Sequence, residues 1–217
     1  MNPLALPLFP LQTVLFPGGL LPLQIFEVRY LDLMKRCWAT GEPFGVVALR
    51  SGHEVRRAPR AGEPDASRET LCEVGTLARL EVCEQVRSGL LRVVARGGER
   101  FALQSAQVLS HGLWQGATTL CPVDQRVTVP DEHSDLRDEL VRVMQALATD
   151  DDPCPPAANS CWQDCGWVAN RWAERLPLPV IERQRLMTLD NPVWRLEMVG
   201  EWLARLRAQL DGQPPQA

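Results

Sequence analysis

Residues 4–26 decide the fold of this chain, and they read LALPLFPLQTVLFPGGLLPLQIF. From Leu4 to Leu8, leucine alternates with other residues, which is the period of a β-strand with one buried face. Pro7 and Pro10 interrupt the run. Because proline has no backbone N–H, we expect this strand at an edge or a bulge of a sheet. The prolines and glycines of the stretch also exclude a membrane-spanning helix.

A turn, a second strand and a helix follow. Phe16-Pro17-Gly18-Gly19 has the composition of a tight turn, and residues 20–25 form a short apolar run. From residue 27 to residue 38 the apolar period becomes that of a helix. The expected buried face of this helix consists of Tyr30, Leu33, Met34, Cys37 and Trp38. Gly41 is its expected stop.

The rest of the first half is predicted to form strands joined by short links. We expect them at residues 44–49, 74–83, 90–96, 101–109 and 113–120. Gly97 and Gly98 predict a link between two of these strands, and Arg87-Ser88-Gly89 predicts the turn of a hairpin. Residues 51–70 are rich in Arg, Gly, Pro, Glu and Ser, which indicates a mobile surface loop.

The second half carries the period of helices, expected at residues 134–147, 161–175, 180–189 and 192–210. Ser134 is the predicted cap of the first one. Its apolar stripe is Leu136, Leu140, Val143, Met144 and Leu147, and that of the last helix is Leu196, Val199, Leu203, Leu206 and Leu210. Residues 150–156 form a linker, and residues 211–217 are an expected frayed tail. We therefore expect a β-rich domain at residues 1–125 and an α-helical bundle at residues 126–217.

Composition narrows the classes of function. The chain has 217 residues and a formal net charge of −4, whereas a general nucleic-acid binder is expected to be basic. Seven cysteines, an odd and scattered set with no export signal before them, indicate reduced thiols and a cytoplasmic protein. We expect no membrane segment.

Catalytic motifs are missing from the sequence. The one lysine, Lys35, lies within a predicted helix with no glycine-rich loop beside it, which excludes a phosphate loop and leaves no other lysine for a Ser–Lys dyad. His53, His111 and His133 have no local signature of a catalytic triad. Cys154, Cys161 and Cys165 are spaced C-x6-C-x3-C, which is typical of core packing more than of a structural zinc site. We expect no catalytic residue, no cofactor and no metal.

Two features remain as candidate surfaces. Trp162, Trp167 and Trp172 follow each other at five-residue steps, so they cannot all face one side of a helix. Either the helix is buried on several sides or an indole is exposed as a binding anchor. Arg50, Arg56, Arg57 and Arg60 form a basic cluster, which is either a solvated surface or a contact for an acidic partner or a nucleic acid.

The first half closely resembles the amino-terminal domain of the ATP-dependent Lon protease, and most of all the stand-alone bacterial proteins that contain this domain alone. The residues that carry the resemblance are Leu6 to Leu11, Val14 to Gly19 and Leu21 to Tyr30. Weaker matches follow at residues 74–78, 97–100 and 176–178, at Gln184, at Asp190 and at residues 195–197. Val28 stands where the family commonly has proline.

The resemblance implies an α+β fold: a PUA-like twisted β-barrel domain followed by an α-helical bundle. In the protease this region is thought to help select substrates, including unfolded chains, while the ATPase and peptidase lie in later domains. We therefore expect a non-catalytic module, such as an adaptor, that binds unfolded polypeptide or a partner protein. The binding residues that we predict are Phe16, Leu20, Trp114 and Trp167. The alternatives are an RNA-binding PUA-like module and a small-molecule binder or unrecognised hydrolase.

Overall fold

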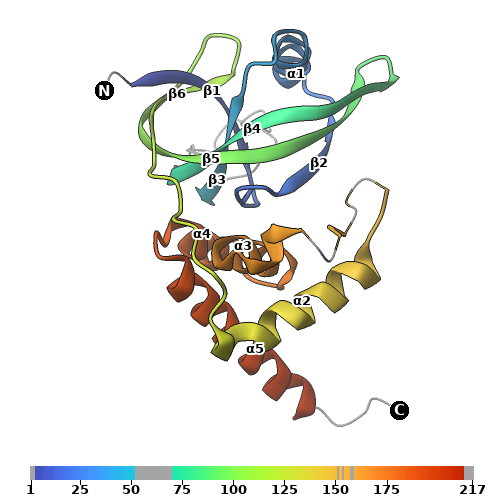
Figure 1. The fold of residues 1–217 in the computed structure, drawn as a ribbon. Coiled ribbons are helices and arrows are strands. Elements are labelled where there is room, and N and C mark those ends of the chain that lie inside the picture. The colour runs from blue at the N-terminus through green and yellow to red at the C-terminus, as the bar shows by residue number, and fades with distance from the viewer. Residues whose placement is uncertain (1–2, 52–69, 151, 153, 157–158, 213–217) are drawn as a thin grey trace. The chain divides into compact units, whose positions relative to one another are not determined.

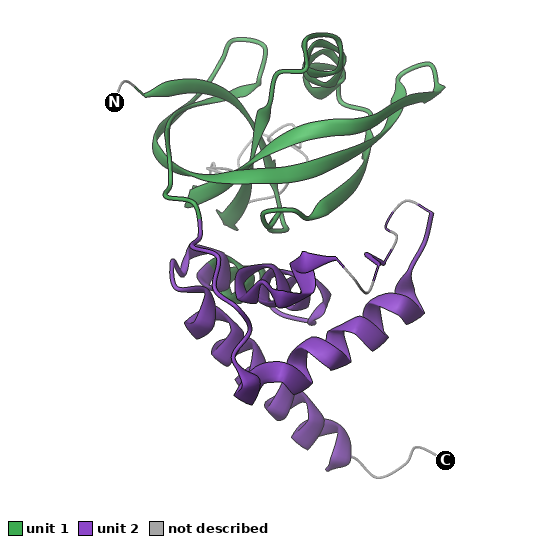
Figure 2. Cartoon of the chain, in the orientation of Figure 1, with its two compact units in different colours: residues 1–123, 179–184 green, residues 124–178, 185–217 purple. Residues whose placement is uncertain are grey.

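The chain divides into two units in the computed structural model, which describes residues 3–51, 70–150, 152, 154–156 and 159–212. Unit 1 comprises residues 1–123 and 179–184, and unit 2 comprises residues 124–178 and 185–217 (Figure 2). Of the mobile loop predicted at residues 51–70, residues 52–69 lie outside the described residues, while Ser51 and Thr70 belong to strands. Most of the predicted frayed tail also lies outside the described residues. No helix in the described ranges is both long enough and apolar enough to cross a membrane.

Unit 1 is built on one sheet. Its strands are β1 Leu4–Leu11, β2 Leu20–Ile25, β3 Phe44–Ser51, β4 Thr70–Arg87, β5 Leu90–Val108 and β6 Trp114–Leu120. The strands are hydrogen-bonded in the order β2-β5-β4-β3-β1-β6, and β6 pairs with β5 as well. The sheet therefore curls into a partial ring (Figure 1). Together with the helices of the second half, this ring confirms the predicted α+β fold.

The strand β1 does not lie at an edge of the sheet, so that prediction was wrong. Residues 4–8 pair antiparallel with β6, and residues 8–11 pair parallel with β3. Pro7 lies in the stretch that pairs with β6, and Pro10 lies in the stretch that pairs with β3. Each proline thus sits where β1 has a partner on one side only, which is the local equivalent of an edge.

One helix, α1 Val28–Thr40, packs against β4. Its buried residues are Tyr30, Leu33, Met34 and Cys37, which join a core cluster with residues of β1, β2 and β3. The expected fifth member, Trp38, is 50% exposed. Trp38 lies about 100° around the helix from Cys37, so it falls at the flank of the buried stripe. The helix stops as predicted at Gly41, whose φ is 70°.

The glycines Gly97 and Gly98 do not link two strands, as the sequence suggested. They lie within the single long strand β5, whose residues 91–96 pair with β2 and whose residues 101–108 pair with β6. Gly97 exchanges hydrogen bonds of 2.8 Å with the backbone of Gly18 and Gly19 in the predicted turn. A Cβ atom at Gly97 would lie 2.2 Å from the carbonyl oxygen of Phe16. Glycine is thus required where the turn docks on the strand.

Gly97→Ala is expected to destabilise the protein because the added methyl group meets backbone that cannot turn aside, at a cost of about 1–3 kcal/mol for overpacking. Gly98→Ala is the matched control. Its Cβ would make an ordinary contact of 3.5 Å with the carbonyl oxygen of Leu77. Chemical denaturation followed by circular dichroism measures both. Equal midpoints for the two variants would contradict the assigned role of Gly97.

Unit 2 consists of helices. They are the 3₁₀ turn η1 Asp131–His133, α2 Ser134–Leu147, the 3₁₀ turn η2 Ser160–Gln163, α3 Cys165–Arg175, α4 Val180–Thr188 (whose first residues count with unit 1) and α5 Pro192–Asp211. Ser134 is the first residue of α2 and not its cap, because the preceding 3₁₀ turn occupies the capping position. The hydroxyl of Ser134 donates to the carbonyl oxygen of Asp131 at 2.7 Å.

The helix predicted at residues 161–175 is broken at Asp164. The Asp164 carboxylate accepts the backbone N–H of Trp167 at 3.0 Å, so it caps α3 and starts a new helix there. Only part of each predicted apolar stripe is buried, namely Leu136, Leu140 and Met144 of α2, and Leu196, Val199 and Leu203 of α5. Leu147 is 61% exposed and Leu210 is 63% exposed, because both lie in the last turn of their helices.

A buried arginine joins the segments of unit 2. Arg195 of α5 is 1% exposed. Its guanidinium donates to the Asp124 carboxylate at 2.6 Å, to the Asn170 side-chain oxygen of α3 at 2.9 Å and to the carbonyl oxygen of Leu186 at 3.1 Å. It also donates to the carbonyl oxygen of Leu189. A single side chain therefore satisfies acceptors from four separate places in the unit.

Arg195→Met keeps a long side chain but leaves the Asp124 carboxylate and three other acceptors without this donor. Removing one member of a buried ion pair costs about 3–5 kcal/mol, so we expect a loss of that order in the free energy of unfolding. The matched control on the same helix is Arg205→Met. Arg205 is 59% exposed, pairs with Glu201 and stacks over the Trp202 ring at 5.2 Å, so its loss should cost about 1 kcal/mol or less. Similar losses for both variants in denaturation curves would refute this reading.

Candidate functional site

Unit 1 contains an apolar groove between β1 and β2, two strands that do not pair with each other. Its volume is about 100 Å³, on the order of one aliphatic side chain. The residues that line it are Phe9, Pro10, Leu11, Leu23, Gln24, Ile25, Phe26, Glu27 and Tyr30. Several of these residues also belong to the core cluster of unit 1, so the groove is an opening onto that core.

The position of β2 explains why the groove is open. Within the described residues β2 pairs with β5 and with no other strand, so its second edge has no hydrogen-bonding neighbour. Phe26 comes directly after β2, where the chain turns toward α1, and it is 58% exposed. An exposed phenylalanine beside an unpaired strand edge presents both apolar surface and backbone hydrogen-bonding groups.

The wall of the groove formed by Phe9 and Tyr30 is held by ring contacts, an ion pair and a hydrogen bond. Phe9 packs edge-on against Tyr30, with ring centroids 4.3 Å apart. Arg29 stacks over the Tyr30 ring at 4.6 Å and pairs with Glu27 at 2.8 Å. The Arg29 guanidinium also donates to the carbonyl oxygen of Gly112 at 2.7 Å, which ties the start of α1 to the turn before β6. These contacts hold the Phe9 and Tyr30 rings in the wall of the groove.

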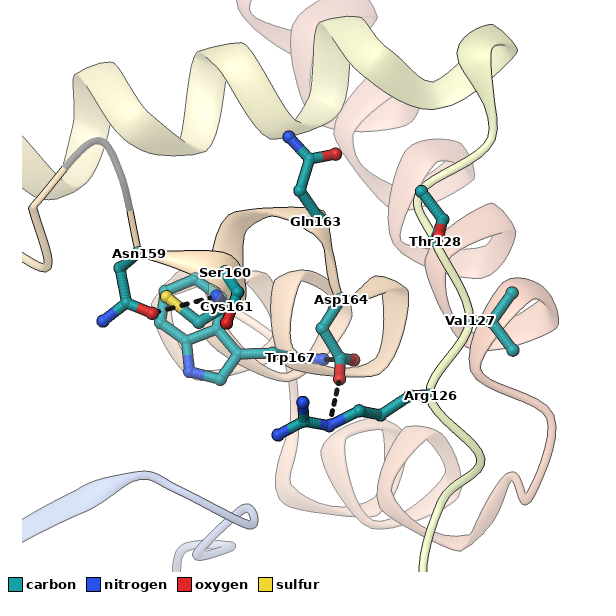
Figure 3. A pocket seen from close by; sticks show the side chains of 9 residues that line it. All are labelled: Arg126, Val127, Thr128, Asn159, Ser160, Cys161, Gln163, Asp164 and Trp167. Atoms are coloured by element: carbon teal, nitrogen blue, oxygen red, sulfur yellow. Dashed lines mark hydrogen bonds and ion pairs between the residues drawn. The ribbon is translucent and has the colours of Figure 1, made fainter.

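A second cavity lies in unit 2, where it is larger and more polar. Its volume is about 290 Å³. Figure 3 shows the side chains that line it, which are Arg126, Val127, Thr128, Asn159, Ser160, Cys161, Gln163, Asp164 and Trp167. Backbone hydrogen bonds hold its two sides together: Cys165 donates to Val127 at 2.8 Å, and Val129 donates to Gln163 at 2.9 Å. We call this cavity the unit 2 pocket.

The three tryptophans of this region have different surroundings. Trp162 and Trp172 are each 4% exposed, and both donate their indole N–H to backbone carbonyl oxygens, of Pro156 at 3.2 Å and of Leu136 at 2.9 Å. Trp167 is half-buried and packs edge-on against Trp162 at 4.9 Å. Two of the three therefore belong to the interior, and Trp167 is the one that reaches a cavity.

Two cysteines of unit 2 that were predicted to pack in the core have different surroundings. Cys165 is fully buried, whereas Cys161 lies in η2 and is half-buried in the wall of the unit 2 pocket. The break at Asp164 separates the two, so they do not share a helix face. All seven cysteines carry free thiols. Among the described residues, no group of three His, Cys, Asp or Glu side chains is arranged to hold a metal ion.

The four predicted binding residues lie in different places. Phe16 is fully buried in the core, where it cannot meet a ligand, and we drop it from the candidates. Leu20 and Trp114 are half-buried and line neither cavity. Trp167 lines the unit 2 pocket. The groove was not predicted from the sequence. The available signal was a large apolar residue, Phe26, at the boundary between a predicted strand and a predicted helix.

The lysine, histidines and arginines that bear on catalysis or nucleic-acid binding lie in separate places. Lys35 is exposed in the middle of α1. His111 is exposed near a turn, and His133 is half-buried before α2. His53 and the arginines Arg56, Arg57 and Arg60 lie outside the described residues. Arg50, the remaining member of the basic cluster, is exposed and lies 3.9 Å from Glu73.

Comparison with known proteins gives one consistent family. The family model of the ATP-dependent protease La (LON) substrate-binding domain matches residues 5–205. The solved structure of a Lon N-terminal domain protein from Xanthomonas campestris is 32% identical, with a TM-score of 0.68, and the match covers 92% of this chain and 98% of that one. The N-terminal domain of a Mycobacterium avium complex Lon protease has a TM-score of 0.57 over the same shares of both chains, and at 14% identity it supports the fold alone.

Curated relatives are longer proteins. Lon protease 4 of Sorangium cellulosum is 38% identical over 117 residues, which are 54% of this chain and 13% of the relative. The Lon protease of Anaeromyxobacter dehalogenans is 26% identical over 209 residues, which are 94% of this chain and 24% of the relative. The chain thus spans about a quarter or less of the length of these relatives.

The thiols of unit 2 provide a test of the pocket geometry. Burial and the nearby Asp164 carboxylate raise the pKa of Cys165 to about 11, and burial also raises the pKa of Cys161. Because the thiolate is the reactive form, iodoacetamide should label Cys161 slowly at pH 7 and about tenfold faster at pH 8. Cys165 should resist labelling until the protein unfolds. Peptide mass spectrometry follows both sites, and labelling of Cys165 before Cys161 would contradict the structure.

Proposed function

The chain belongs to the family of LON substrate-binding domains, and on this premise we propose that it binds unfolded or extended polypeptide through the apolar groove of unit 1. The single observation that carries the proposal is the groove beside the unpaired edge of β2, with Phe26 58% exposed at its rim. An unfolded chain offers the complement of this surface: apolar side chains together with unpaired backbone N–H and C=O groups.

Energetics supports an extended ligand over a single residue. Burying one leucine, valine or phenylalanine side chain contributes about 1.5–3 kcal/mol, which alone corresponds to very weak binding. A segment that also hydrogen-bonds to the free edge of β2 gains main-chain contacts that do not depend on its sequence. Pro22 at the centre of β2 offers no N–H, so such pairing is limited to its flanks. Binding would then be weak, tolerant of sequence and favoured by apolar residues.

The proposed role is non-catalytic. The groove walls contain aromatic and aliphatic side chains with Gln24 and Glu27 as the polar members. Such a surface holds a chain, and it offers no nucleophile paired with a base. We therefore propose that the protein acts in the cytoplasm as a recognition module or adaptor that presents polypeptides to other proteins.

Phe26→Ala should lower the affinity for an unfolded, apolar-rich model protein about tenfold, because the rim of the groove loses one aromatic contact. The matched control is Val86→Ala in the β4–β5 hairpin, where the side chain is 59% exposed and lies outside the groove. Fluorescence anisotropy with a labelled, permanently unfolded protein measures both variants. Unchanged affinity for Phe26→Ala, or an equal loss for Val86→Ala, would count against the groove.

The same titration separates the RNA-binding alternative. Contact with phosphates makes affinity fall steeply with salt, whereas burial of apolar surface does not. We expect binding of the unfolded protein to change little between 50 mM and 200 mM salt. If RNA binds with a steep salt dependence that Arg56→Ala and Arg57→Ala reduce, and the unfolded protein does not bind, the alternative replaces this proposal.

A further inference from the structure

The unit 2 pocket has side-chain hydrogen-bond donors for which the described residues provide no acceptor. Arg126 is 90% exposed, and its Nε lies 4.0 Å from the Asp164 carboxylate, which is too long for a hydrogen bond. Within the described part of the chain, Arg126 makes no hydrogen bond at all. A guanidinium has five N–H donors in a planar fork. Figure 3 shows this fork below Asp164, on the side of the pocket where Trp167 lies.

Trp167 supplies a further free donor. The indole N–H groups of Trp162 and Trp172 both donate to backbone carbonyl oxygens. The indole N–H of Trp167 has no acceptor among the described residues, although this side chain is half-buried in the pocket wall. This N–H is therefore available to an acceptor on a ligand that enters the pocket.

Two side-chain acceptors of the pocket are engaged within the protein. One oxygen of Asp164 caps α3 by accepting the backbone N–H of Trp167 at 3.0 Å. The side-chain oxygen of Asn159 accepts the backbone N–H of Cys161 at 3.0 Å, which leaves its amide group as a donor. The Arg126 guanidinium, the Trp167 indole N–H and the Asn159 amide are donors at this pocket that a ligand with acceptor oxygens would complement.

We propose that the unit 2 pocket binds a carboxylate group of a polypeptide, with the Arg126 fork on the carboxylate and the Trp167 indole N–H on a neighbouring oxygen. A planar guanidinium and a carboxylate match each other in a two-point contact. The Asp164 charge at the pocket favours a single negative charge over the double charge of a phosphate. The inference deepens the proposed function, because it names a second recognition element for bound polypeptide.

Two sources can supply the carboxylate, the carboxyl terminus or an acidic side chain, and three short peptides distinguish them. The first has a free carboxyl terminus and no acidic residue, the second has the same sequence with a terminal amide, and the third is the amide with one internal glutamate. All three lack large apolar residues, so they do not address the groove of unit 1. Occupancy is read from Cys161, whose thiol lines the pocket.

The free-acid peptide should slow iodoacetamide labelling of Cys161 in the full chain, and the neutral amide should not. Protection by the glutamate peptide as well assigns the site to carboxylates in general, and its absence assigns it to the carboxyl terminus. Equal protection by the neutral amide, or no protection by either acid, would overturn the proposal. So would inorganic phosphate protecting as strongly as the acids.

Variants test the two donors. Arg126→Gln and Trp167→Phe should each weaken the protecting peptide about tenfold, since each removes a hydrogen bond to a charged group. Arg205→Gln on α5 is the matched control, because Arg205 is also exposed and lies outside the pocket. Phe26→Ala should leave protection of Cys161 unchanged. If Phe26→Ala still binds the unfolded protein at full affinity while the free-acid peptide protects Cys161, the groove proposal fails alone. If Phe26→Ala loses unfolded-protein binding while neither acid protects Cys161, the pocket proposal fails alone.

Discussion

The close approach of the Phe16–Gly19 turn to Gly97 is the constraint on which unit 1 depends. β5 serves two partners, with residues 91–96 on β2 and residues 101–108 on β6. The change of partner occurs next to Gly97, where the turn exchanges two backbone hydrogen bonds with the strand. Thr76 on β4 reinforces the same point by donating to the carbonyl oxygen of Leu15 at 2.6 Å. Any side chain at Gly97 would push the turn away.

The groove is a consequence of that constraint. Because the turn holds β2 on the first half of β5, β2 remains at the end of the strand order while β1 pairs elsewhere in the ring. The gap between β1 and β2 leaves Phe26 at the surface and the core residues Phe9 and Tyr30 in the wall. β2 is thus the strand whose second edge has no paired strand along its whole length among the described residues, and this edge is where we place polypeptide binding.

Local pattern predicted the elements well, and tertiary pairing explains the misses. The 3.6-residue period of α1 and the stop at Gly41 depend on near neighbours, so they could be read directly from the sequence. The central position of β1 and the continuity of β5 through Gly97 depend on partners far along the chain, which no local period reveals. The site residues were harder for the same reason. Phe16 stands in a sequence typical of an exposed turn, but the docking of that turn buries it. Arg126 belongs to no sequence motif that would mark it as a binding residue.

Amide hydrogen exchange with and without a permanently unfolded protein is the most direct test of polypeptide binding at the groove. Polypeptide bound at the groove should slow exchange at residues 23–30, which form the edge of β2 and the start of α1. Residues 84–90 at the tip of the β4–β5 hairpin should be unaffected and serve as an internal reference. If the unfolded protein binds but exchange at residues 23–30 stays unchanged while another surface becomes protected, polypeptide does not bind at the groove.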